Sequence, residues 1–285
     1  MFRKGSVKST YKASGTCALV PRRPVRLQFF LLVACLAVAA ALGALFAAAE
    51  SSGGTPLPTP DEVFVLAGQS NMLGRAFPLS GGESSDPHLV VWRKKAWKVA
   101  VDPLGDPKVT ENGVGPGMTF GLGALEQLQP ETVGIVMCAV SGTTISKWKP
   151  PSSVYTNCID QVHAAGGHIE GILFLHGESD ATNQSDAGAW AKRFKIVLNG
   201  FRTDLGTDVP FVIGQIGKIT ASGFGYQKTV RDQQATAATA QPGLAMITTK
   251  DLATGSDGLH FTIASYKTIG ERFATAWWQL RQLYP

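Results

Sequence analysis

Short, continuous runs of apolar residues alternate along the chain with longer segments in which apolar positions recur every three or four residues. A continuous apolar run is typical of a strand buried on both faces, and the longer segments have the spacing of amphipathic helices. The pattern predicts strands at residues 63–67, 89–92, 133–139, 172–175, 210–216 and 244–248. It predicts helices at residues 117–128, 154–165, 186–205, 226–240 and 262–283.

Alternating strands and helices predict an α/β fold in which helices cover both faces of a parallel sheet. We assign this domain to residues 61–285, and the sequence contains no internal repeat. In such sheets, ligand sites lie in the crevice at the carboxyl ends of the strands. The polar segments that directly follow strands are therefore the first candidates for chemistry.

Residues 29–49 form an unbroken apolar run before this domain. As a helix rising about 1.5 Å per residue, the run spans roughly 31 Å, about one hydrocarbon core. Basic residues precede it, which predicts a cytoplasmic tail at residues 1–28 and a lumenal or extracellular domain beyond a flexible stem at residues 50–60. We therefore expect a single-pass membrane protein anchored through residues 29–49. The alternative is a signal peptide cleaved near residues 47–49, which releases a secreted domain.

The net charge of +5 belongs to the N-terminal segment. Residues 1–49 contain seven of the 26 Lys and Arg residues and none of the 21 acidic ones. The rest of the chain is therefore slightly acidic, and we expect no nucleic-acid partner. An apolar content of 44% over 285 residues is enough for a buried core and excludes a wholly disordered chain.

Two of the four cysteines, Cys138 and Cys158, belong to the folded domain. In an oxidising compartment they can form one disulfide. Because Cys138 ends an apolar run, a buried free thiol is the alternative, and the sequence leaves both open.

A serine and a later Asp–His pair are the strongest candidates for catalysis. Ser70 lies in GQSNM (residues 68–72), directly after the first predicted strand, and Asp257 and His260 lie in DGLH (residues 257–260). A serine nucleophile needs a base to take its proton, and the base needs an acid group to orient its ring. The alternatives are a serine that caps a helix or turn, a capping aspartate and an ordinary loop histidine.

Two further loops follow predicted strands. Gly142, in SGTT at residues 141–144, permits a close backbone approach, so its N–H is available to a developing oxyanion unless the segment is an ordinary turn. His176 and Glu178, in HGESD at residues 176–180, are too few for a metal site. The chain also has no glycine-rich phosphate loop followed by Lys-Ser/Thr. We therefore expect neither a metal nor an organic cofactor.

The motifs GQSNM, GVGPGM, SGTT, HGESD and DGLH occur in this order between residues 62 and 273. In this combination the sequence resembles the SGNH-hydrolase superfamily, and within it the sialate O-acetylesterase and acetyl xylan esterase group of carbohydrate esterases. The resemblance implies a three-layer α/β/α sandwich with a parallel, flavodoxin-like sheet. It implies Ser70 as the nucleophile, His260 as general base and then acid, and Asp257 as the residue that orients His260.

The resemblance also implies an oxyanion hole made by the backbone N–H groups of Ser70 and Gly142 and by a third donor at His176. The family usually has Gln at this third position, and an imidazole replaces it only if one N–H faces the site. The substrate contacts that the resemblance implies are Asn71, Glu178 and Trp148, with packing in the core as the alternative for Trp148.

Together with the resemblance, these residues imply a serine esterase that removes O-acetyl groups from a carbohydrate through an acetyl-enzyme intermediate. The expected partner is an O-acetylated glycan. Two alternatives remain: a membrane-anchored carbohydrate-binding protein with little turnover, for which the departure at His176 is the argument, and a hydrolase of small esters with broader scope.

Overall fold

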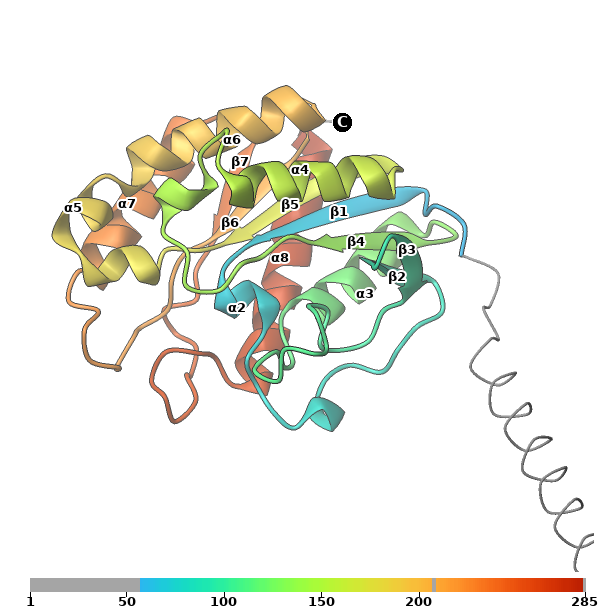
Figure 1. Cartoon of the computed structure of the whole chain (residues 1–285), viewed down its shortest axis with the longest axis horizontal. Helices are drawn as coiled ribbons and strands as arrows, with labels where there is room; N and C mark the ends of the chain where they lie inside the picture. Colours follow the sequence, from blue (N-terminus) through green and yellow to red (C-terminus); the bar gives the residue numbers. More distant parts are fainter. Residues whose placement is uncertain (1–56, 207–208, 284–285) are drawn as a thin grey trace, which may run out of the picture. The chain divides into compact units, whose positions relative to one another are not determined.

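The computed structural model describes residues 57–206 and 209–283, which contain a seven-stranded sheet with helices on both faces (Figure 1). The strands lie in the order β3-β2-β4-β1-β5-β6-β7, and every neighbouring pair is parallel except β2 and β3. The strands are β1 (Glu62–Gly68), β2 (Leu89–Arg93), β3 (Ala96–Val99), β4 (Val133–Met137), β5 (His168–Leu175), β6 (Phe211–Gly214) and β7 (Leu244–Ile247).

The long helices form two layers around this sheet. Figure 1 shows α4 and α6 on one side of the sheet and α3 and α8 on the other. The helices are α2 (Ser70–Leu73), α3 (Gly117–Leu128), α4 (Ser153–Ala165), α5 (Gln184–Gly188), α6 (Trp190–Leu205), α7 (Gln227–Ala240) and α8 (Ile263–Leu283). Short 3₁₀ turns are η1 (Leu79–Gly81), η2 (Ile145–Trp148) and η3 (Ser179–Thr182).

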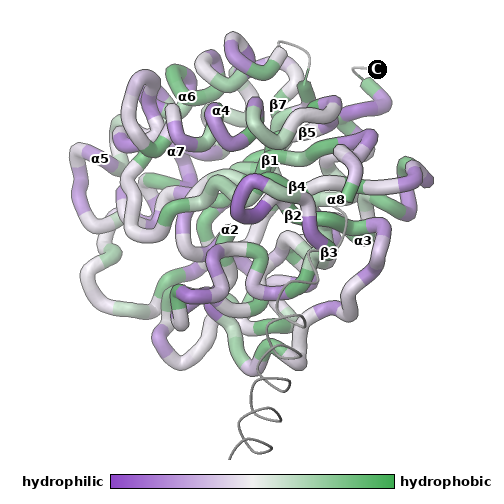
Figure 2. Tube along the Cα trace, turned by 45° about the vertical axis from the view of Figure 1, so that its right-hand side comes forward, coloured by the Kyte–Doolittle hydropathy of each residue, from purple (hydrophilic) through white to green (hydrophobic). Residues whose placement is uncertain are grey.

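β1 shows why a continuous apolar run becomes a central strand. Successive side chains of a strand point to opposite faces, so such a run supplies both cores. Val63 and Val65 enter the core shared with α4 and α6, whereas Phe64 and Leu66 enter the core shared with α3 and α8. Figure 2 accordingly shows β1 and β4 as hydrophobic stretches of the tube. Each fully buried side chain of this size contributes roughly 1.5–3 kcal/mol.

The predicted α/β architecture is confirmed, and the differences lie mainly at element boundaries. All six predicted strands and all five predicted helical segments are present. β5 begins at His168, earlier than predicted, and β4 ends at Met137. The helix predicted at residues 186–205 is divided at Ala189 into α5 and α6. The first of these begins at Gln184, because Asn183 caps it by accepting hydrogen bonds from the N–H groups of Ser185 and Asp186.

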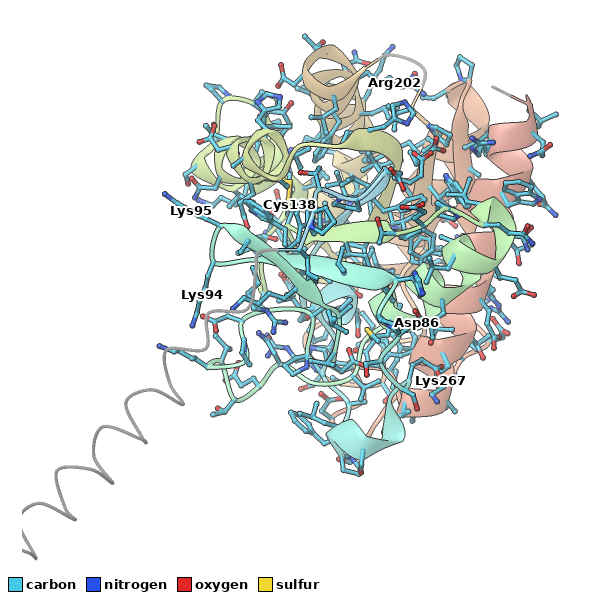
Figure 3. The ribbon with its side chains drawn as sticks, turned by 90° about the vertical axis from the view of Figure 1, so that its right-hand side faces the viewer. Asp86, Lys94, Lys95, Cys138, Arg202 and Lys267 are labelled. Carbon is cyan, nitrogen blue, oxygen red and sulfur yellow. A yellow bond between two sulfur atoms is a disulfide. The ribbon has the colours of Figure 1, made fainter. Side chains whose placement is uncertain are left out.

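The edge strand β3 was not predicted. It pairs antiparallel with β2 through a two-residue turn at Lys94 and Lys95, which Figure 3 labels. Both lysines have positive φ angles, 52° and 59°. Two-residue hairpins need this conformation and usually place Asn or Gly there. A Lys-Lys pair therefore carries no recognisable turn signal.

The assignment as a single-pass membrane protein is corrected. In the part of the chain that the structure describes, no helix is both long enough and apolar enough to cross a bilayer. Residues 29–49, from which the anchor was predicted, lie outside the described residues, as do the tail at residues 1–28 and most of the stem at residues 50–60. The folded part of the chain is a compact unit within residues 56–285.

A disulfide joins Cys138, just after β4, to Cys158 in α4 (Figure 3). Their Cα atoms are 5.2 Å apart, and both residues are buried. Of the two possibilities that the sequence left open, the structure has the disulfide. It fixes the start of the loop that carries Gly142 to the helical layer.

Candidate active site

The order of the strands reverses at β1, which has β4 on one side and β5 on the other. At such a switch point the loops that leave the neighbouring strands diverge and open a crevice at their carboxyl ends. Ser70 follows β1, Gly142 follows β4, and residues 176–179 follow β5. The topology therefore brings three of the predicted loops to one edge of the sheet.

Ser70 stands on a sharp turn between β1 and α2. The turn requires glycine at position 68, because its φ is +130° and an added Cβ would lie 2.1 Å from the carbonyl oxygen of Leu175. The N–H of Gln69 donates to this same oxygen at 3.0 Å. The chain then enters α2 with Ser70 as its first residue, which directs the hydroxyl toward the crevice.

His260 and Asp257 reach Ser70 from the loop before α8. The Nε2 atom of His260 lies 2.9 Å from the Ser70 hydroxyl, and its Nδ1 lies 2.6 Å from Oδ2 of Asp257. The other carboxylate oxygen, Oδ1, accepts the N–H groups of Leu259 at 2.9 Å and His260 at 3.0 Å. Partial burial alone would raise the pKa of Asp257, but these N–H groups and the imidazole together hold it below its usual range. Asp257 is therefore ionised and faces Nδ1.

The loop after β4 brings Gly142 to the same crevice. Gly142 has a φ of +68°, and an added Cβ would meet no atom within 4 Å, so the residue borders open space. The loop is held from below, because both carboxylate oxygens of Asp180 accept the N–H of Ile145, at 3.1 and 3.0 Å. Burial raises the pKa of Asp180 to about 7, although the Ile145 N–H opposes this.

These groups line a cavity of about 830 Å³, within the range of roughly 300–1,000 Å³ that is usual for small-molecule sites. Its wall includes Ser70, Gly142, Glu178, Asp257 and His260 from the sequence predictions. The residues that sequence analysis did not single out are Gln69, Arg75, Phe77, Glu111, Ser141, Thr144, Ser179, Thr182, Phe224 and Leu259.

His176, predicted as the third oxyanion donor, is outside the cavity wall. Its imidazole is fully buried and stacks on Phe174, with ring centroids 5.2 Å apart. Its Nδ1 lies 3.7 Å from Oδ2 of Asp180, longer than a hydrogen bond, and the ring faces the core instead of the cavity. Burial lowers the pKa of His176 to about 3, and the nearby backbone of Thr143 opposes this only in part. The ring is therefore neutral and packed in the core, and the sequence-based role is corrected.

Trp148 also belongs to the core rather than to the cavity wall. It is fully buried, its Nε1 donates to the hydroxyl of Thr143 at 3.1 Å, and its ring packs edge-on against Phe174. Of the two possibilities for Trp148, the structure has the packed one. It supports the loop of Gly142 from beneath.

Asn71 is likewise buried and holds the site together instead of lining it. Its amide nitrogen donates to Glu178 at 2.6 Å and to the carbonyl of Leu259 at 3.4 Å. Its oxygen accepts from the hydroxyl of Tyr266 at 2.7 Å and from the N–H of Phe261 at 3.4 Å. One carboxamide thus joins the Ser70 helix to the His260 loop, to α8 and to the loop after β5.

Glu178 lies in the cavity wall and is almost completely buried. Burial raises the pKa of Glu178, against the opposing effects of the Asn71 amide and of His260. Its Oε2 atom has no hydrogen-bond partner among the described residues. The role of Glu178 in binding a substrate hydroxyl stays a prediction, because its Oε2 atom is itself buried.

The group of side chains with spacing suited to a metal lies at the opposite end of β1 and β5. Glu62, His168 and Glu170 place ligand atoms within 4.8 Å of one another. Arg281 already donates to Glu170 at 2.8 Å, and Nδ1 of His168 lies 3.1 Å from Glu62 and 3.2 Å from Glu170. These contacts already engage the carboxylates with protein partners, at the strand ends away from Ser70.

Comparison with known proteins places this geometry in context. The family model described as carbohydrate esterase, sialic acid-specific acetylesterase, matches residues 60–279. A probable carbohydrate esterase of Arabidopsis thaliana is 30% identical over 256 residues, covering 78% of this chain and 92% of the relative.

Solved structures show the same fold. An Arabidopsis thaliana protein superposes with a TM-score of 0.69 at 27% identity, covering 77% of this chain and 98% of that chain. A carbohydrate acetylesterase from Xanthomonas citri superposes with a TM-score of 0.59 at 18% identity, covering 76% and 55%. The predicted resemblance is confirmed by these matches.

Proposed function

Because this chain belongs to the sialic acid-specific acetylesterase family of carbohydrate esterases, we propose that it deacetylates a carbohydrate through a Ser70–His260–Asp257 triad. Membership makes the protein a carboxylic ester hydrolase that acts on O-acetylated carbohydrate. The observation that carries the proposed mechanism is the unbroken chain of hydrogen bonds from the Ser70 hydroxyl to His260, at 2.9 Å, and on to Asp257, at 2.6 Å.

In the first half-reaction, the Ser70 oxygen attacks the acetyl carbonyl carbon while Nε2 of His260 takes the hydroxyl proton. Ionised Asp257 keeps the other proton on Nδ1 and stabilises the imidazolium that forms. The tetrahedral intermediate collapses, the bond to the sugar oxygen breaks, and His260 returns its proton to that oxygen. The products of this step are the free sugar hydroxyl and an acetyl ester on Ser70.

In the second half-reaction, water takes the place of the sugar. His260 removes a proton from the water as its oxygen attacks the acetyl-enzyme, and then returns a proton to the Ser70 oxygen. Acetate leaves and the free enzyme is restored. The same base therefore serves both halves, which requires only that the cavity admit water after the sugar has left.

The developing negative charge on the acetyl oxygen needs hydrogen-bond donors. The N–H groups of Ser70 and Gly142 donate to no acceptor within the described residues, and both residues line the cavity. Donors that are fixed before the reaction stabilise an oxyanion without the cost of reorientation. These two N–H groups supply the backbone part of the oxyanion hole.

Gln69 supplies the third donor in place of His176. Its Oε1 accepts the N–H groups of Gly177 and Ser179, each at 3.5 Å, so the nitrogen of its carboxamide faces away from this loop. Gln69 is only 2% exposed, yet its Nε2 is not a buried atom left without a partner in the described chain. Gln69 is also the carboxamide in the cavity wall, directly beside Ser70. The N–H groups of Gln69 therefore reach the cavity from the turn after β1, whereas the family usually places its Gln in the loop after β5.

The activity is tested with p-nitrophenyl esters of increasing acyl length and residues 57–285. We expect rapid hydrolysis of the acetate and at least about tenfold lower kcat/KM for the octanoate, because the family releases acetyl groups. Equal rates for both esters favour the broader hydrolase instead. A folded protein that hydrolyses neither, nor an acetylated oligosaccharide, contradicts the proposed activity.

Replacing Gln69 by Glu is expected to lower kcat by about 10²- to 10³-fold, because it removes the donor and keeps the acceptor for Gly177 and Ser179. The measurement is the kcat of p-nitrophenyl acetate hydrolysis, with thermal unfolding to establish that the variant folds. The matched control is His176→Phe, which removes a buried imidazole that lies outside the cavity wall and only 3.7 Å from Asp180, and it should keep kcat within about threefold. A loss of kcat in the control alone assigns the third donor to His176.

A further inference from the structure

A second cavity, of about 490 Å³, adjoins the first at the catalytic histidine. The two cavities share Arg75, Phe77, Asp257 and His260 in their walls. The second continues along residues 255–256 and 261–264, on the side of the His260 loop away from Gly142. With the acetylated sugar over Ser70 in the first cavity, the second cavity offers space for a part of the substrate beyond that sugar.

The ring of Phe77 lies where the two cavities meet. It is 53% exposed, the largest value among the exposed aromatic side chains of the described residues. Single exposed apolar residues are common on protein surfaces and by themselves indicate nothing. The position of Phe77 does indicate a binding role, because Phe77 belongs to the walls of both cavities beside His260.

The backbone that carries this ring is fixed. Ala76 and Val114 exchange two hydrogen bonds, at 3.3 and 2.8 Å, and the N–H of Gly113 donates to Gly74 at 3.0 Å. Position 113 admits only glycine, since an added Cβ would lie 2.3 Å from the carbonyl oxygen of Ala76. Phe77 is therefore presented to solvent by a braced segment, so little conformational entropy is lost when a ligand covers the ring.

The surroundings of the ring match the chemistry of a sugar. A pyranose has a C–H face that packs on an aromatic ring and hydroxyl groups around its edge. Around Phe77, the second cavity offers the hydroxyl of Ser256 and the guanidinium of Arg75 as polar partners. An acyl chain has no hydroxyl groups to satisfy these partners, whereas a neighbouring sugar unit does.

We propose that the enzyme takes an acetylated oligosaccharide, with the acetylated unit over Ser70 and the adjoining unit packed on Phe77 in the second cavity. The proposal rests on the proposed esterase function for the position of the acetylated unit. It assigns Phe77 as the residue that distinguishes a glycan chain from a single sugar.

The test measures binding separately from catalysis. Acetylated xylose, xylobiose and xylotriose are titrated into the Ser70→Ala protein by calorimetry. We expect Kd to fall about tenfold from the monosaccharide to the disaccharide, and Phe77→Ala in the same protein to abolish this gain. Phe77→Trp should restore it, and Leu79→Ala, an exposed apolar residue outside both cavities, should leave it intact.

Steady-state kinetics of the protein with Ser70 intact provide the second readout. Phe77→Ala should raise KM for the disaccharide about tenfold while kcat changes less than threefold, because the lost contact lies away from the reacting ester. Equal Kd values for all three sugars overturn the oligosaccharide proposal. A Phe77→Ala variant that weakens the binding of all three sugars by the same factor overturns it as well. A selective loss of octanoate hydrolysis in Phe77→Ala also overturns it, in favour of an acyl-chain site. Length-dependent binding without turnover contradicts the esterase mechanism and leaves the sugar site supported.

Discussion

Replacing Ser70 by Ala is expected to lower kcat for p-nitrophenyl acetate by about 10⁴-fold or more. The hydroxyl is the atom 2.9 Å from Nε2 of His260, and no acetyl-enzyme can form without it. The measurement is the initial rate at saturating ester, together with mass spectrometry of the protein. Ser70 protein quenched during turnover should carry an added acetyl group, and the variant should carry none.

The matched control for this variant is Ser141→Ala. Ser141 lines the same cavity, but its hydroxyl accepts a hydrogen bond from Arg75 and lies outside the chain of bonds to His260. We expect the control to keep kcat within about tenfold. Retained hydrolysis in Ser70→Ala, or loss in the control alone, would show that Ser70 is not the nucleophile. A melting temperature close to that of the unsubstituted protein excludes misfolding, since within the described part of the chain the removed hydroxyl bonds to His260 alone.

The central strands and the segments proposed for catalysis could be located from the sequence because their signals are local. A continuous apolar run is visible in the sequence, and β1 fills both cores with its alternate residues. The segments GQSNM and DGLH directly follow a strand and precede a helix, respectively, so their place at the crevice follows from the topology of a parallel sheet. The edge strand β3 lacked such a signal, because its turn is formed by two lysines with positive φ.

The place of His176 could have been inferred from strand geometry. Residues two apart on a strand point to the same face, so His176 continues the face of Phe174 just beyond β5. Phe174 belongs to the core beneath α4 and α6, and His176 stacks on it. The motif indicated only that residue 176 is a histidine. The direction of its side chain follows from the strand that precedes it.

The role of Gln69 had no comparable signal. Its orientation depends on the N–H groups of Gly177 and Ser179, which are more than 100 positions away in the sequence. Asn71 is similar, because its partners Glu178, Leu259 and Tyr266 come from three distant segments. Residues whose function is to join loops are recognised only when the loops are placed in space.

Replacing Asp257 by Asn is expected to lower kcat about 10⁴-fold while the variant still folds. In the wild type, one carboxylate oxygen accepts the N–H groups of Leu259 and His260, and the other faces Nδ1 of His260. An Asn has one oxygen, which the two backbone N–H groups retain. Its NH₂ group then faces Nδ1 and forces that atom to accept. The proton moves to Nε2, which can no longer take the proton of Ser70.

The control for Asp257→Asn is Asp251→Asn, an exposed aspartate paired with Arg272, whose hydrogen bonds lower the Asp251 pKa to about 2. It removes a carboxylate from the neighbouring loop without touching His260, so kcat should stay within about twofold.

The lowered pKa of Asp257 also determines how its contribution to the free energy of unfolding changes with pH. Its stabilising contribution is present above its unfolded pKa and is lost as the pH falls through the lower folded value. The stability deficit of Asp257→Asn should therefore be constant near neutral pH and shrink in acid, as measured by urea unfolding. A deficit that grows in acid, or a kcat within tenfold of the wild type, contradicts the role of Asp257 as the ionised partner of His260.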